Sequence, residues 1–378
     1  MRKKPHTGRR LKAAAVLLFL SAVLLLLAAN RPGFAQWYAR TVYPLLVGTL
    51  GRVSGWFPFS VSEMGIYVLL ILFFVMLARL AFRCVRPGNS ESADCSGGRQ
   101  EGAAWLSGVL LAAGILLFLY TVCCGVNYHR KSFSEEEGIV TYRYSVQELE
   151  EICLWLTGEV NRIAGEVPRD AQGVMQLSPV GSEKEGAVQA MHHLAETFPS
   201  LEGYYPEPKE LAVSQILSYQ GLTGIYLPFT VEANYNGDMT PYNKPFTACH
   251  ELSHLRGFMQ EQEANFIAFL ACISSERTDF RYSGYLSGWV YCMNALYRAD
   301  AGSWQEVRAS LAEEAEPDLA ANNAFWERHE GTVSQTAERI NDTYLKVNGQ
   351  PDGVRSYDRM VDLIVAYFGD EISDTWQD

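Results

Sequence analysis

The 378-residue chain is 48% hydrophobic and 20% charged, and its formal net charge is −12. Residues 1–128 carry 13 Lys and Arg against 4 Asp and Glu, whereas residues 129–378 carry 18 against 39. A basic, apolar front section and an acidic rear section indicate a membrane part followed by a soluble part, and the acidic part argues against nucleic-acid binding, which needs a basic surface.

Three apolar runs in the front section are each about 20 residues long, the length that a helix needs to cross a bilayer. They cover residues 11–29, 61–82 and 103–126. We therefore expect a membrane domain over residues 1–128 with three transmembrane helices and the lipid bilayer as its partner. A cleaved signal peptide is an alternative for the first run, but that run is long for the role and two further spans follow.

The basic residues around these runs predict the orientation of the chain. One side of the membrane receives Arg2, Lys3, Lys4, Arg9, Arg10, Lys12, Arg79, Arg83, Arg86 and Arg99, and the other receives Arg31, Arg40, Arg52, Arg130 and Lys131. Basic residues concentrate on the cytoplasmic side of membrane proteins. The sequence therefore predicts a multi-pass cell-membrane protein with a cytoplasmic N-terminus and residues 129–378 outside the cytoplasm.

Helical spacing of apolar residues dominates the rear section, as at Val146, Leu149, Ile152 and Leu156. One strand candidate, Gly224–Val231, contains a proline, which confines it to the edge of a sheet. The predicted fold class is therefore mainly α, with a small sheet in the domain that follows the membrane helices.

The segment Phe246–Gly257 is the main candidate for chemistry, and its composition predicts a helix that ends at the glycine. His250 and His254 are four residues apart, so both imidazoles leave the same face of that helix and can bind one ion. Glu251 lies beside the metal without binding it, where it can take a proton from a metal-bound water. This is the HExxH arrangement of zinc peptidases.

A catalytic zinc needs a third protein ligand, and two acids follow closely, Glu261 and Glu263. On an unbroken helix Glu261 would lie about 16 Å beyond His250 along the axis, so the chain must turn back, and Gly257 is where it can do so. We favour Glu261 as the ligand, because Asn265 shares its face and can support a histidine. Glu263 would point about 160° away on that second helix and is the alternative.

The motif HExxH followed by Glu-x-x-Ala-Asn is similar to that of the gluzincin metallopeptidases. This resemblance implies that His250, His254 and Glu261 are zinc ligands, that Glu251 is the catalytic base, and that the extracytoplasmic domain, residues 129–378, has a zincin-like α+β fold. Asn265 replaces the Asp that is common there, and the connection to Glu261 is shorter than usual. The pattern also resembles the metzincins up to Gly257, but Gln260 stands where their third histidine belongs.

Nearly the whole chain resembles the DUF3810 type of bacterial membrane proteins. The resemblance rests on Pro58-Phe59-Ser60, Tyr226–Asn234, His250–Gly257, Glu263–Phe266 and Phe280–Gly284. The activity of that family is itself inferred. The resemblance therefore indicates which family the chain is similar to, but it does not indicate a particular reaction.

Secondary candidates have a functional and a purely structural interpretation. The strand Gly224–Val231 either pairs with an extended substrate or is a plain structural strand, and Glu232 and Asn234 after it either line the cleft or form a turn. Tyr282 either donates a hydrogen bond to the oxyanion or packs in the core. Tyr357, near a C-terminal turn, is interpreted as packing.

The resulting hypothesis is a membrane-anchored zinc metallopeptidase that hydrolyses peptide or protein substrates through a metal-activated water. Zn²⁺ is preferred because two imidazoles and a carboxylate with an open position suit it. Two alternatives remain: a non-catalytic membrane sensor or scaffold with a structural metal or none, and a metal hydrolase of a non-peptide amide bond in the cell envelope.

Overall fold

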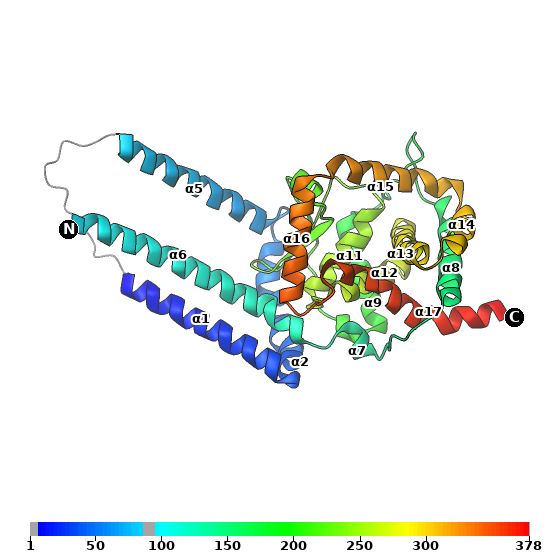
Figure 1. The fold of residues 1–378 in the computed structure, drawn as a ribbon, viewed down its shortest axis with the longest axis horizontal. Coiled ribbons are helices and arrows are strands. Elements are labelled where there is room, and N and C mark those ends of the chain that lie inside the picture. The colour runs from blue at the N-terminus through cyan, green and yellow to red at the C-terminus, as the bar shows by residue number, and fades with distance from the viewer. Residues whose placement is uncertain (1–6, 86–94, 378) are drawn as a thin grey trace.

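Three long helices extend from one side of a mainly helical domain in the computed structural model, which describes residues 7–85 and 95–377 (Figure 1). These helices are α1 (Thr7–Asn30), α5 (Val61–Val85) and α6 (Cys95–Cys123). Each contains a stretch long and apolar enough to cross a membrane, which confirms the three predicted spans. Of the basic residues used to predict orientation, Arg2, Lys3, Lys4 and Arg86 lie outside the described residues.

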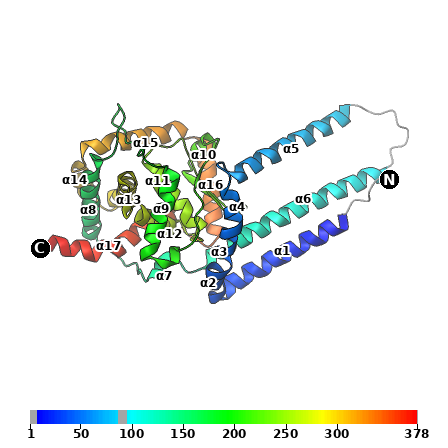
Figure 2. The same ribbon diagram turned by 180° about the vertical axis from the view of Figure 1, so that it is seen from behind.

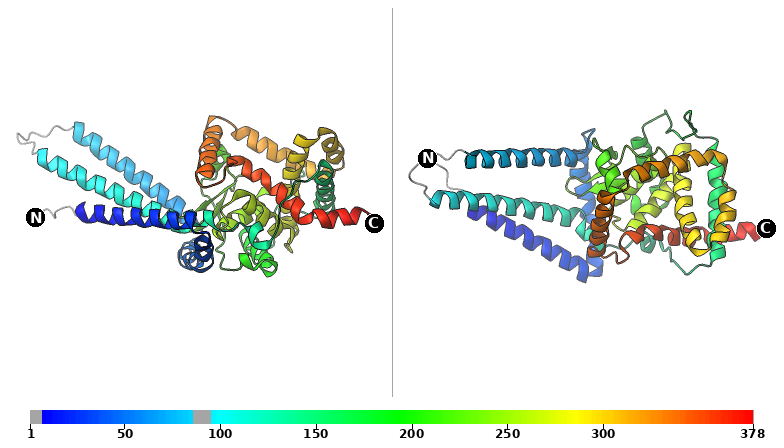
Figure 3. Two further views of the ribbon diagram at one scale, coloured as in Figure 1. Left: turned by 60° about the horizontal axis from the view of Figure 1, so that its bottom comes forward. Right: turned by 45° about the horizontal axis from the view of Figure 1, so that its top comes forward.

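The three spans are not packed equally. Helices α1 and α6 lie against each other along their length, whereas α5 stands apart from both (Figures 1 and 2). Small residues allow the close approach, since Gly114 on α6 faces the backbone of Ala14 on α1. Both views in Figure 3 show the spans leaving the domain on the same side, with the C-terminus at the opposite end.

The connection between the first two spans is helical. It forms α2 (Pro32–Thr41), α3 (Tyr43–Leu46), a π-helical turn (Val47–Gly51) and α4 (Arg52–Gly55). These elements cross the ends of the spans (Figure 2). Ala35, Tyr38, Tyr43 and Val47 are buried in the same apolar core as the residues of the large domain. The core is therefore continuous across the boundary expected at residue 128.

The large domain is built mostly of helices of moderate length. They are α7 (Phe133–Glu137), α8 (Val146–Ala164), α9 (Glu183–Thr197), α10 (Gln215–Gln220), α11 (Asn243–Leu255), α12 (Glu261–Ile273), α13 (Thr278–Ala299), α14 (Ala301–Ala309), α15 (Glu316–His329), α16 (Thr332–Val347) and α17 (Met360–Gln377). Ser145 begins α8 with a capping box that Glu148 completes. Helix α12 is buried on almost every side between α11, α13, α9 and α17, because its sequence is apolar all round after the first turn.

A three-stranded sheet with the order β1-β3-β2 lies beside α11. The strands are β1 (Lys209–Glu210), β2 (Gly224–Leu227) and β3 (Glu232–Tyr235), with β1 parallel and β2 antiparallel to β3. Within residues 7–85 and 95–377, strand β2 pairs with β3 alone, which confirms the predicted edge strand, and it ends before Pro228. The mainly helical fold with a small sheet is likewise confirmed.

The expectation that Glu232 and Asn234 line a cleft or form a turn is wrong, because both are buried in the central strand β3. The carboxylate of Glu232 accepts hydrogen bonds from the amides of Val61 and Ser62, each at 2.9 Å, and forms an ion pair with Lys209 at 2.5 Å. A carboxylate at the positive end of a helix is stabilising. Glu232 thus joins the sheet to the first turn of the second span.

Candidate metal centre

The two helices that carry the predicted ligands are connected by a tight reversal. Helix α11 ends at Leu255, and Gly257 adopts a φ of 97°, a left-handed conformation that glycine accepts without strain. The amide of Gly257 donates to the carbonyl of His254 at 2.8 Å. Helix α12 then begins at Glu261. The reversal predicted from the sequence therefore exists, and it returns the chain to the face of α11 that carries the two histidines.

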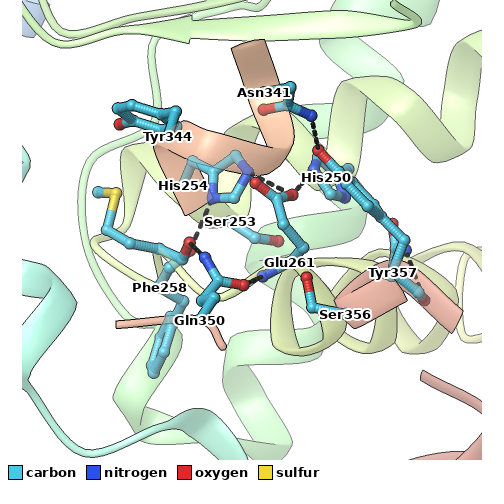
Figure 4. Close-up of polar contacts among 12 residues, drawn as sticks. His250, Ser253, His254, Phe258, Glu261, Asn341, Tyr344, Gln350, Ser356 and Tyr357 are labelled. Atoms are coloured by element: carbon cyan, nitrogen blue, oxygen red, sulfur yellow. Dashed lines mark hydrogen bonds and ion pairs between the residues drawn. The ribbon is translucent and has the colours of Figure 1, made fainter. Parts of the chain in front are cut away.

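Three side chains converge at this reversal: His250, His254 and Glu261 (Figure 4). Their candidate ligand atoms all lie within 4.8 Å of one another. Oε2 of Glu261 lies 3.2 Å from Nε2 of His250 and 3.3 Å from Nε2 of His254. Ligands about 2.0–2.1 Å from a tetrahedral ion are separated by about 3.3 Å. The spacing therefore fits a metal ion held by two imidazoles and one carboxylate.

The hydrogen bonding around the cluster also fits a metal. Oε2 of Glu261 is buried and makes no well-aligned hydrogen bond among the described residues, and its nearest polar neighbours are the two imidazole nitrogens. A buried anionic oxygen in this position is stabilised by a cation. Nδ1 of His254 lies 2.8 Å from the carbonyl oxygen of Phe258. A proton on Nδ1 is donated to that carbonyl, and the lone pair of Nε2 is then directed at the cluster.

Asn265 supports the cluster from the next turn of α12. Its amide nitrogen lies 3.3 Å from the hydroxyl of Tyr291 and 3.3 Å from the carbonyl oxygen of Tyr357. Both bonds use the NH₂ group, so the amide oxygen is left for the imidazole of His250. The Asn265 side chain is accordingly one of the groups that act to raise the pKa of His250, against the larger lowering effect of burial.

The metal-free cluster holds its charge as an ion pair. Burial acts to lower the pKa of His254, but the Glu261 carboxylate outweighs it and raises that pKa to about 9. Burial acts to raise the pKa of Glu261, but the charge of His254 and the close contacts of both imidazoles bring it down to about 2. A cation is thus favoured at the point where the three side chains meet.

Glu251 lies next to this cluster but does not belong to it. Its side chain is buried, and Oε2 has no hydrogen-bond partner in the part of the chain that the structure describes. Burial raises the pKa of Glu251 to about 8 in the metal-free protein. The carboxylate therefore has no structural partner that would hold it away from a water molecule in the adjoining cavity.

Glu263, the alternative ligand, points away from the cluster. Its carboxylate accepts hydrogen bonds from the amide of Ser134 at 2.9 Å and from the hydroxyl of Ser134 at 2.7 Å. Burial raises the pKa of Glu263. Two residues along a helix are on opposite faces, so the side of α12 that presents Glu261 to the histidines turns Glu263 toward α7. The structure brings Glu261, and not Glu263, to the histidines.

Tyr282 also lies apart from the cluster. Its hydroxyl donates to Asp318 at 2.5 Å and lies 3.3 Å from a guanidinium nitrogen of Arg169. It is fully buried and lines neither of the two cavities that contain His250. The oxyanion role considered from the sequence is therefore wrong, because α13 directs this phenol into a separate polar network.

A tyrosine interpreted from the sequence as packing occupies the position expected of Tyr282. The ring of Tyr357 stacks on His250 with 6.4 Å between centroids, and Asn341 donates to its hydroxyl at 3.5 Å (Figure 4). Burial is the main cause that raises the pKa of Tyr357, and the charges of Glu261 and Glu251 add to it. The phenol therefore keeps its proton beside the cluster.

Two cavities meet at the cluster and form one cleft. One has a volume of about 610 Å³ and the other about 300 Å³. His250, Glu251 and Tyr357 line both, and Gly224 at the start of β2 lines both as well. Ile225 and Tyr226 of β2 border the smaller cavity. The edge strand therefore runs along the cleft in which the cluster lies.

A family model described as "Protein of unknown function (DUF3810)" matches residues 38–365. The match covers the second and third spans and every residue of the cluster. No curated protein and no solved structure matches the chain.

Proposed function

The chain belongs to the DUF3810 family, whose description assigns no reaction, and we propose from its site that it is a membrane-anchored, zinc-dependent peptidase. His250, His254 and Glu261 are the metal ligands in this proposal, and Glu251 is the general base. In this proposal the domain lies outside the cytoplasm, as the distribution of basic residues in the sequence predicts.

One observation carries the proposal more than any other. Three buried ligand atoms converge with the spacing of a tetrahedral site. A second buried carboxylate, that of Glu251, stands beside them in an open cleft, and its Oε2 has no hydrogen-bond partner among the described residues. A structural metal site is closed by protein ligands and has no use for a free carboxylate. The combination supports a catalytic site over a structural one.

The residues of the cleft supply the parts of amide hydrolysis. A bound zinc ion would lower the pKa of a water molecule and polarise the substrate carbonyl. Glu251 accepts the proton that this water loses and delivers it to the nitrogen of the leaving amine. The phenol of Tyr357 donates a hydrogen bond to the carbonyl oxygen as charge develops there.

The edge strand favours a polypeptide as the substrate. Strand β2 has a free edge on the side away from β3, and an extended peptide can add to such an edge through backbone hydrogen bonds. The alternative substrate is a non-peptide amide of the cell envelope, which has no regular backbone to pair with a strand. We therefore rank peptide bonds first.

Metal analysis of the full-length protein in detergent tests the proposal. We expect about one zinc ion per chain and hydrolysis of a random peptide library that stops on chelation and returns when zinc is added. Metal content is read by mass spectrometry and cleavage by peptide sequencing. Zinc-loaded protein that cleaves no peptide would contradict the peptidase, and protein that binds no metal would contradict the site.

A second prediction concerns Gly224, because a side chain at this position would displace the carboxylate of Glu251, the proposed general base. A Cβ on Gly224 would collide with Oε1 of Glu251 and lie 2.8 Å from its Cγ. Gly224→Ala is expected to lower the rate constant of peptide hydrolysis by at least about tenfold, since small misplacements of a catalytic group are costly, with metal content unchanged. Gly158→Ala is the control, because nothing lies within 4 Å of that position. Equal rates in the two variants would contradict the assigned placement of Glu251.

A further inference from the structure

The smaller cavity of the cleft lies directly against the end of the third span. Cys124 and Tyr128, which line it, follow the last residue of α6. The hydroxyl of Tyr226 on β2 also lies 3.2 Å from the carbonyl oxygen of Cys123. Only a few side chains therefore separate the membrane-crossing helix from the cluster.

The same junction is fixed to α11 from the other side. The hydroxyl of Tyr43 lies 2.9 Å from that of Tyr226 and 2.9 Å from the carbonyl oxygen of Leu255, the residue after a ligand. Tyr43 is completely buried. These contacts fix the cluster at the membrane end of the domain.

The helical segment between the first two spans seats this end of the domain on the bilayer surface. Trp37, Leu45 and Trp56 are 53%, 66% and 74% exposed, although they are large and apolar. They lie on α2, on α3 and directly after α4, and these helices are at the level where the spans enter the domain (Figure 2). Aromatic residues concentrate at the membrane–water interface. The smaller cavity is therefore at the height of the interface.

The two cavities differ in chemistry as well as in position. The membrane-side cavity is lined mainly by aromatic and apolar residues: Tyr128, Ile225, Tyr226, Pro228, Met259 and Tyr344. The larger cavity extends toward α13 and α15, farther from the spans (Figure 1). Its lining includes amides and acids: Gln220, Asn294, Asn322, Glu330, Gln335 and Glu338. The larger cavity is also lined by apolar residues such as Phe246 and Val290. A substrate in this cleft would therefore meet mainly aromatic and apolar surface toward the membrane and a mixed, more polar surface away from it.

We infer that the cleft takes polypeptides anchored in the same membrane and cuts them within a few residues of the bilayer. The inference rests on the proposed peptidase function and adds its substrate class. A chain leaving a membrane helix changes from apolar to polar residues along its length, in the same order as the two cavities. The free edge of β2 receives the backbone of that chain where it passes the cluster.

Reconstituted full-length protein and anchored reporters test the inference. Each reporter has one membrane-spanning helix, a flexible Gly/Ser spacer and a randomised segment of about 12 residues, with the spacer either about 5 or about 40 residues long. Both reporters have the same anchor, so both are concentrated at the membrane. A third reporter lacks the anchor. Mass spectrometry gives the cut positions and the rates.

We expect the short-spacer reporter to be cut at least about tenfold faster than the long-spacer reporter, which corresponds to about 1.4 kcal/mol. Cuts should cluster next to the anchor. Equal rates for the two anchored reporters would show that the membrane only concentrates the substrate, and would overturn the inference while the peptidase stands. Zinc-loaded protein that cuts none of the three reporters would overturn the peptidase as well.

A pair of variants assigns the preference to the membrane-side cavity. Tyr344→Ser removes a ring that lines this cavity, and it is expected to lower the ratio of short-spacer to long-spacer cleavage by at least about threefold, because apolar contact is lost. Tyr297→Ser, on the exposed surface of α13 and outside both cavities, is the matched control and should leave the ratio unchanged. An unchanged ratio in Tyr344→Ser would overturn the assigned role of the cavity.

Discussion

Glu251→Gln is expected to remove peptide hydrolysis while the metal stays bound. The amide of glutamine has nearly the volume of the carboxylate, so the buried site accepts it, but the amide cannot take a proton from water. Loss of a general base typically costs about 10²–10⁴ in rate. The ligands His250, His254 and Glu261 are untouched, and the metal content should remain at about one ion per chain.

The measurement pairs metal content with single-turnover hydrolysis of the same protein sample. Glu306→Gln is a suitable control, because Glu306 is exposed on α14 and lines neither of the two cavities. Its hydrolysis rate should stay close to that of the parent. Equal hydrolysis by the parent and Glu251→Gln would rule out Glu251 as the base, whatever the metal content.

The second large effect is expected from substitutions of the two acids at the start of α12. One acid is a proposed metal ligand, and the other makes only structural contacts. Glu261→Gln removes a ligand whose carboxylate oxygen lies 3.2 and 3.3 Å from the two imidazoles. Residues that only support a ligand change metal affinity by about 10–100-fold, so loss of a ligand should weaken zinc binding by more than about 100-fold. Hydrolysis should disappear with the metal.

Glu263→Gln is the matched control for this prediction, since it lies two residues away and is equally buried. Glutamine can still accept the hydrogen bond from the amide of Ser134, and burial already raises the pKa of Glu263 and favours its neutral form. Isothermal titration with zinc should give nearly the parent affinity. If Glu263→Gln lost zinc and Glu261→Gln kept it, the ligand assignment would be reversed.

The core of the site could be predicted from sequence because its geometry is local. Two histidines four residues apart must share a helix face, and Gly257 marks the one place nearby where the chain turns back at low cost. The opposite directions of Glu261 and Glu263 follow from helix geometry in the same way. The three spans and the edge strand were predictable for a similar reason, since each depends on composition within one short segment.

The parts that could not be predicted depend on contacts between distant segments. Tyr357 reaches the cluster from a 3₁₀ segment, Gly353–Arg359, about 100 residues after the histidines, and no spacing rule distinguishes it from the other 19 tyrosines of the chain. For the same reason, the sequence could not show that Tyr282 lies too far from the cluster for the oxyanion role. The sequence left Glu232 as either a cleft residue or a turn residue, because its partners, Val61 and Ser62, lie about 170 residues earlier.

The continuous core that joins residues 28–47 to the large domain has a consequence for how this protein is used and handled. Glu136 on α7 binds Gln36, Arg40 and the buried Arg130 together, at 2.8, 3.0 and 2.6 Å, so charged groups as well as apolar ones cross the junction. A chain that began at residue 129 would lack Tyr43 and Ala35, and the core residues that pack against them would be exposed to solvent. We therefore expect a fragment that begins at residue 129 to lose the packing that positions the candidate metal centre.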